Sequence, residues 1–93
     1  MSAHVVVHAT IKDAEKFQEY GAAAGPTAAS FGGEVISRGV STSLHGDKPG
    51  ELMVIIQFPT KDAAENWYNS SEYQKLIPTR NEGIDSIFVL GGE

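Results

Sequence analysis

Apolar and β-branched residues gather in four short runs along the chain, and turn-forming residues separate these runs. The runs predict strands over residues 4–10, 34–40, 51–58 and 84–90. The run over 51–58, ELMVIIQF, has the strongest strand pattern. Residues 41–50 contain the turn-forming pairs Gly46-Asp47 and Pro49-Gly50, so we predict a hairpin loop between the second and third strands.

The segment between the first two strands has the periodicity of a helix. Apolar residues recur at steps of three and four from Ala14 to Phe31, and Asp13 can cap the N-terminus. The pair Gly25-Pro26 interrupts this face without changing its period. The pattern therefore predicts either one kinked helix or two helices, with Pro26 in the first turn of the second. Gly32-Gly33 ends the helical region.

A second helical region follows the third strand. Thr60 can cap a helix with a short apolar face (Ala63, Ala64, Trp67 and Tyr68), and Asn69-Ser70 ends it. Ser71 and Gln74 match a capping box for a short helix that reaches about Ile77 and ends at Pro78. Gly83 leads into the last strand.

The order strand, helix, strand, strand, helix, strand predicts one α+β domain over residues 1–93, a ferredoxin-like βαββαβ fold with a four-stranded antiparallel sheet. Two helices can cover only one face of such a sheet. Yet consecutive apolar residues occur in the first, third and fourth strands, so both faces of the sheet favour burial. We therefore expect a homodimer that pairs the two uncovered sheet faces.

Composition and charge exclude several functions. The formal net charge is −5, and the seven basic residues are scattered, which argues against a nucleic-acid partner. The longest apolar run, 52–56, is too short for a membrane span. Cysteine is absent, which removes disulfides, thiol nucleophiles and cysteine-based zinc sites. The N-terminus lacks the pattern of a signal peptide, so we expect a cytoplasmic protein.

Three features of the sequence carry a resemblance to a known family. They are the apolar helix face, the pair Arg38-Gly39 and the segment WY-x-S-x-EY at 67–73, followed by Arg80. The chain resembles an uncharacterised domain-of-unknown-function branch of the dimeric α+β barrel superfamily. This resemblance implies a ferredoxin-like monomer and a barrel formed by two facing sheets. The wider superfamily includes cofactor-free oxygenases, small isomerases and lyases, haem-degrading enzymes and stress proteins, so the resemblance implies a fold and no single function.

The histidines do not indicate a metal or haem site. His4 and His8 share one face of the first strand but lie about 13 Å apart, too far to bind one ion. Each is either a lone general base or a histidine at a strand edge or dimer seam. The haem-degrading relatives use an axial histidine beside a tryptophan and an asparagine, and no histidine follows His45. We therefore expect no metal and no cofactor.

The best candidate site is a cavity that binds a small, partly apolar anion. Arg38 lies in an apolar strand, where its guanidinium needs an internal carboxylate, a solvated edge or a bound anion. An internal salt bridge is the favoured interpretation of the three. Tyr20, Trp67 and Tyr73 would line the cavity, although Trp67 also suits core packing. Arg80 is expected on a solvated loop.

The resulting hypothesis is a small-molecule-binding protein, with a cofactor-independent enzyme as one form of it. The alternative is a non-catalytic stress or scaffold protein whose barrel is filled with side chains. A cavity beside Arg38 would distinguish the two.

Overall fold

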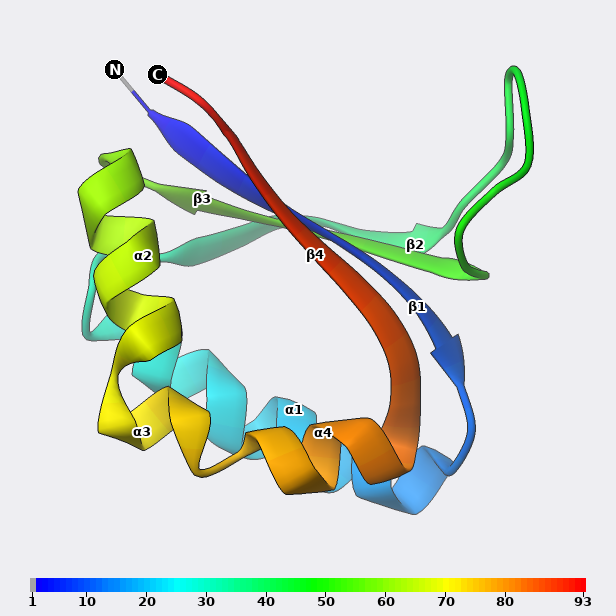
Figure 1. Cartoon of the computed structure of the whole chain (residues 1–93), viewed down its shortest axis with the longest axis horizontal. Helices are drawn as coiled ribbons and strands as arrows, with labels where there is room; N and C mark the ends of the chain where they lie inside the picture. The colour runs from blue at the N-terminus through cyan, green and yellow to red at the C-terminus, as the bar shows by residue number, and fades with distance from the viewer. Residues whose placement is uncertain (1) are drawn as a thin grey trace.

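The structure, a computed structural model, describes residues 2–93 and contains the predicted elements in the predicted order (Figure 1). The strands are β1 (Ala3–Ile11), β2 (Glu34–Val40), β3 (Leu52–Phe58) and β4 (Ile84–Gly92). They form one antiparallel sheet in the order β2-β3-β1-β4, which confirms the ferredoxin-like α+β fold. The helices are α1 (Ala14–Ala29), α2 (Lys61–Asn69), α3 (Ser71–Gln74) and α4 (Ile77–Gly83).

Helix α1 is a single helix that contains Pro26, which decides between the two alternatives left open by the sequence. Asp13 caps it as predicted, because its Oδ1 accepts hydrogen bonds from the amides of Glu15 and Lys16. Thr60 likewise caps α2 through the amide of Ala63.

Two helix boundaries near residue 75 were predicted incorrectly. Ser70, rather than Ser71, caps α3 by accepting a hydrogen bond from the amide of Tyr73 at 3.2 Å. Pro78 does not end a helix but lies in the first turn of α4, where proline leaves no intrahelical hydrogen bond unmade. This additional short helix places Arg80 on a helix rather than on a loop.

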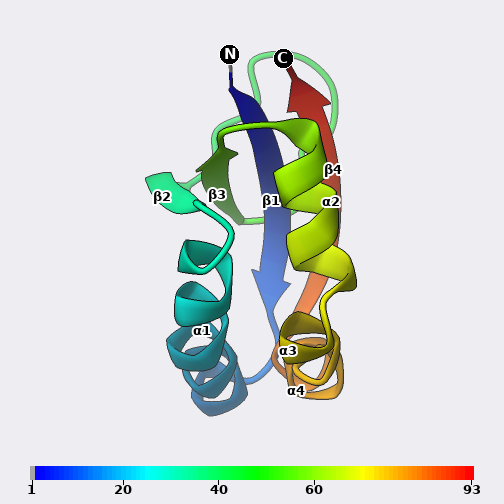
Figure 2. The ribbon, with the colours of Figure 1, turned by 90° about the vertical axis from the view of Figure 1, so that its left-hand side faces the viewer.

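All four helices lie on one side of the sheet (Figure 2). The burial pattern of β1 follows from this arrangement, because residues Ala3, Val5, Val7 and Ala9 are buried under the helices and alternate with partly exposed ones. The core between sheet and helices contains three fully buried aromatic side chains, Phe58, Trp67 and Tyr73.

The other side of the sheet carries an apolar surface that no helix of the described residues covers, here called the bare face. It is formed by alternate residues of all four strands (Val6, Ile36, Met53, Ile55, Ile87 and Val89, with His4 and His8). Ile36, Ile87 and Val89 are 47%, 49% and 54% exposed. No helix within residues 2–93 combines the length and apolar character required to cross a bilayer.

Candidate functional site

Helix α1 packs mainly against α4, and the contact is close at Gly83. A Cβ at this position would lie 2.7 Å from the backbone nitrogen of Phe17, so only glycine permits the approach. The carbonyl of Gly83 also accepts a hydrogen bond from the amide of Lys12 at 2.8 Å. Glycine at position 83 therefore allows α4 to pack closely against the beginning of α1.

A cavity of about 430 Å³ lies between α1 and the strands. Its walls are mostly apolar. Beyond Tyr20, the residues that α1 contributes are all small (Gly21, Ala22, Ala24, Gly25 and Ala28). An added Cβ at Gly21 or Gly25 would meet nothing within 4 Å. Glycine inside a helix costs roughly 0.5–1 kcal/mol relative to alanine. The small residues on this helix face thus leave open a space that larger side chains could fill.

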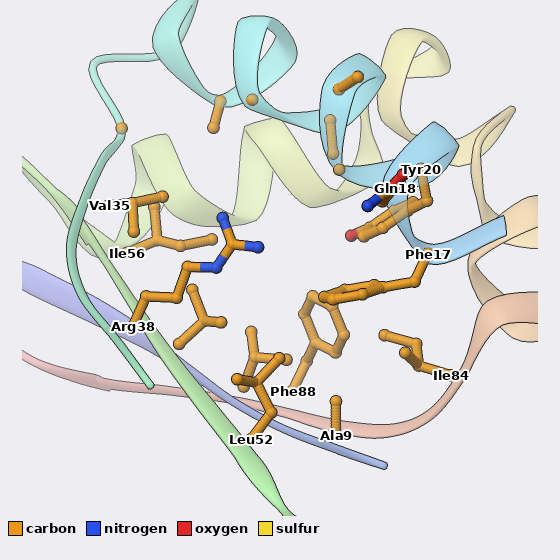
Figure 3. A pocket seen from close by; sticks show the side chains of 18 of the residues that line it. Ala9, Phe17, Gln18, Tyr20, Val35, Arg38, Leu52, Ile56, Ile84 and Phe88 are labelled. Atoms are coloured by element: carbon orange, nitrogen blue, oxygen red, sulfur yellow. The ribbon is translucent and has the colours of Figure 1, made fainter. Parts of the chain in front are cut away.

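Arg38 extends into this cavity from β2 (Figure 3). The register of β2 shifts between Val35 and Ser37, and Arg38 pairs with Val54, whose side chain also lines the cavity. The favoured expectation of an internal salt bridge was wrong. The ion pairs among residues 2–93 are three surface lysine–carboxylate pairs, and none involves Arg38. Because β2 is an exposed edge strand, the guanidinium needs no internal counter-ion.

The three aromatic residues predicted to line the cavity differ in their positions. The rings of Tyr20 and Trp67 form part of its wall. The indole N–H of Trp67 donates to the Oγ1 of Thr27 at 3.0 Å, so this donor is already satisfied. Tyr73 does not line the cavity; it is fully buried behind Tyr20, and the two hydroxyls are 2.8 Å apart.

Arg80 contacts the aromatic cluster, contrary to the expectation of a solvated loop residue. Its Nη1 donates hydrogen bonds to the hydroxyls of Tyr68 and Tyr73, both at 3.0 Å. The guanidinium carbon lies 4.9 Å from the centroid of the Phe88 ring. Burial alone would lower the pKa of Arg80, but these hydrogen bonds outweigh it and raise the pKa, so the side chain stays charged. The preceding helix was predicted to end at Pro78, and this error hid the contact of Arg80 with the aromatic cluster.

The buried tyrosines are expected to make the fold sensitive to alkaline pH. Burial raises the pKa of Tyr20 and of Tyr73 above the ordinary 10.0. For Tyr73, the hydrogen bonds that it shares with Tyr20 and Arg80 oppose this rise in pKa without overcoming it. Above pH 10 the unfolded chain binds fewer protons at these two groups than the folded chain does, so the free energy of unfolding falls as pH rises. The loss of stability per pH unit should be steepest above pH 10, where the tyrosines of the unfolded chain ionise.

Urea unfolding between pH 8 and pH 11 measures this slope. The Tyr20→Phe variant should show a shallower slope, because only the contribution of Tyr73 remains. An equal slope in wild type and variant would contradict the assignment.

A comparison with protein families supports the resemblance found in the sequence. The family model described as "Domain of unknown function (DUF1330)" matches residues 2–91. The chain belongs to this family. No curated protein matches the sequence of this DUF1330 chain.

Solved structures similar to the DUF1330 chain share its fold at low sequence identity. A protein of unknown function from Rhodopseudomonas palustris is 19% identical, with a TM-score of 0.80 over 99% of this chain and 82% of that one. SnoaB, a cofactor-independent oxygenase from Streptomyces nogalater, is 15% identical (TM-score 0.70, 99% and 92%). A dimeric ferredoxin-like protein of unknown function from Thermobifida fusca is 12% identical (TM-score 0.66, 100% and 92%). At these identities the DUF1330 chain shares a fold with them, and activity does not follow.

Proposed function

We propose that this protein binds a small, partly apolar anion in the cavity between α1 and the sheet. The observation that carries the proposal is Arg38, a guanidinium that reaches an apolar cavity without a carboxylate partner among residues 2–93. A planar guanidinium suits a carboxylate, which it can hold by two parallel hydrogen bonds. The apolar walls would bury the remainder of the ligand.

The open cavity favours this function over the alternative of a non-catalytic scaffold. A barrel filled with side chains would place large residues where α1 instead carries Gly21 and Gly25. Catalysis without a cofactor is compatible with the proposal, since SnoaB is a cofactor-independent oxygenase of the same fold. Ligand binding itself requires no reaction, so measurements of binding alone can test the proposal.

We also propose that two copies pair through the bare face. Ile36, Ile87 and Val89 each leave about half of their surface exposed on it, an unusual apolar area for a lone domain. A second copy, sheet against sheet, would cover this area, as in the barrel that the family resemblance implies. The Thermobifida fusca relative is described as dimeric, which supports the proposal.

The ligand proposal is tested by thermal unfolding in the presence of a library of small carboxylates. A carboxylate at a hundredfold excess over its Kd should stabilise the wild type by about 2.7 kcal/mol, a rise in Tm of roughly 10–20 °C for a domain of this size. Arg38→Gln should reduce the affinity at least tenfold because it removes the charged hydrogen bonds. Arg38→Lys should retain part of the affinity, since the charge remains without the planar fork.

Two further variants control for charge and for the cavity. Lys48→Gln removes a positive charge from the exposed hairpin loop and should bind the same carboxylates as the wild type. Gly21→Leu places a side chain in the cavity and should abolish binding while the protein stays folded. The proposal fails if no carboxylate raises the Tm of the wild type, or if Arg38→Gln binds as tightly as Lys48→Gln.

A further inference from the structure

Three side chains, Arg80, Tyr73 and Tyr20, form a hydrogen-bonded chain that ends at the cavity wall. The Nη1 of Arg80 lies 3.0 Å from the hydroxyl of Tyr73, which lies 2.8 Å from the hydroxyl of Tyr20. Tyr20 is the only one of the three that lines the cavity. The direction in which each hydrogen bond points decides what the chain presents to a ligand.

Arg80 sets the direction of the chain. A guanidinium has only donors, so the Tyr73 hydroxyl oxygen must accept from it. Tyr73 is fully buried, and its own hydroxyl hydrogen still requires an acceptor. The Tyr20 oxygen is the remaining hydrogen-bond partner of this hydroxyl among residues 2–93. Tyr73 therefore donates to Tyr20, because the opposite direction would leave a buried donor unsatisfied.

Tyr20 then has a free hydroxyl hydrogen. Its oxygen accepts from Tyr73, and no other side chain or carbonyl of residues 2–93 hydrogen-bonds to the Tyr20 hydroxyl. In Figure 3 this hydroxyl points into the cavity, and the guanidinium of Arg38 points into it from the opposite side. Burial raises the pKa of Tyr20, so the group remains a neutral donor and does not become a base.

We infer that the ligand carries two polar ends, a carboxylate or similar anion that binds Arg38 and a carbonyl-type acceptor oxygen that binds the Tyr20 hydroxyl. This inference rests on the proposed ligand site and adds the substrate class, an oxo-acid with an apolar connecting segment. The Tyr20 hydroxyl accepts a hydrogen bond from Tyr73, whose hydroxyl is polarised by the charge of Arg80. This makes the Tyr20 hydroxyl a stronger donor than an isolated phenol.

The test compares methyl-ketone carboxylates with fatty acids of the same chain length, in a length series that starts at 4-oxopentanoate and pentanoate. Isothermal titration calorimetry gives the Kd of each probe for wild type, Tyr20→Phe and Arg38→Gln. At the chain length that spans both groups, the ketone should bind the wild type roughly three- to tenfold more tightly than its fatty acid. Tyr20→Phe should remove this preference and leave the affinity for the fatty acid unchanged.

Tyr68→Phe is the matched control, because it also removes a hydroxyl that accepts from Arg80 but one outside the cavity lining. Its preference for the ketone should equal that of the wild type. The inference is overturned if fatty acids bind in an Arg38-dependent manner but the ketone adds nothing at any length, or if Tyr20→Phe keeps the preference. If neither series binds the wild type, the proposed carboxylate site itself fails. Failure of the oxo-acid inference alone is recognised by fatty acids that still bind through Arg38.

Discussion

Replacing Arg80 with methionine is expected to lower the free energy of unfolding by about 2–4 kcal/mol. The variant loses two charge-assisted hydrogen bonds, to Tyr68 and Tyr73, and the contact with the face of Phe88. It also leaves the buried Tyr73 hydroxyl without its donor. Methionine preserves much of the apolar length of the side chain, so the loss reports on the guanidinium. Urea unfolding at one fixed protein concentration measures it.

Arg38 provides the matched control, because it is the other arginine of the chain. Arg38→Met should change the free energy of unfolding by no more than about 0.5 kcal/mol, since Arg38 is exposed and forms no ion pair with the described residues. The two variants should therefore separate, with Arg80 required for stability and Arg38 for ligand binding. Equal losses in both would contradict the difference in environment that the structure assigns to the two arginines.

Replacing Ile55 with lysine is expected to dissociate the proposed dimer into folded monomers. Ile55 lies at the centre of the bare face, on β3 and opposite Val6 of the neighbouring strand. In a sheet-to-sheet dimer its replacement would bury two unpaired ammonium groups near the twofold axis, which costs several kcal/mol per charge. Multi-angle light scattering should show the mass fall from a dimer to the 9.9 kDa monomer, with an unchanged far-ultraviolet circular dichroism spectrum.

The adjacent residue gives a control in the opposite direction. Val54 precedes Ile55 on β3, so its side chain points to the helices and lines the cavity opposite Arg38. Val54→Lys places a second positive charge beside that guanidinium, so the monomer should lose stability and carboxylate affinity should change, while the dimer persists. A wild type that is monomeric at micromolar concentration, or an Ile55→Lys variant that stays dimeric, would refute pairing through the bare face.

The order of the elements was predictable because it depends on local periodicity. Runs of β-branched residues, and apolar residues at steps of three and four, appear directly in the sequence, and the caps at Asp13 and Thr60 depend on side chains next to the helices they begin. Pro78 was predicted to end a helix but lies in the first turn of one, because proline is common both just after a helix and in its first turn. The choice depends on whether the following residues pack, which in α4 they do against α1.

The candidate site was predictable only in part, since it depends on contacts between residues far apart in the chain. The sequence alone determined the fold class and showed that both faces of the sheet are apolar, although the helices can cover only one. It also placed Arg38, Tyr20 and Trp67 on the elements that form the cavity. Only the tertiary structure decided that Arg38 reaches the cavity without a carboxylate partner among residues 2–93, whereas Arg80 hydrogen-bonds to Tyr73 behind Tyr20. The physical reason is that burial and hydrogen-bond partners are set by packing across the sheet, and neither is encoded in the spacing of neighbouring residues.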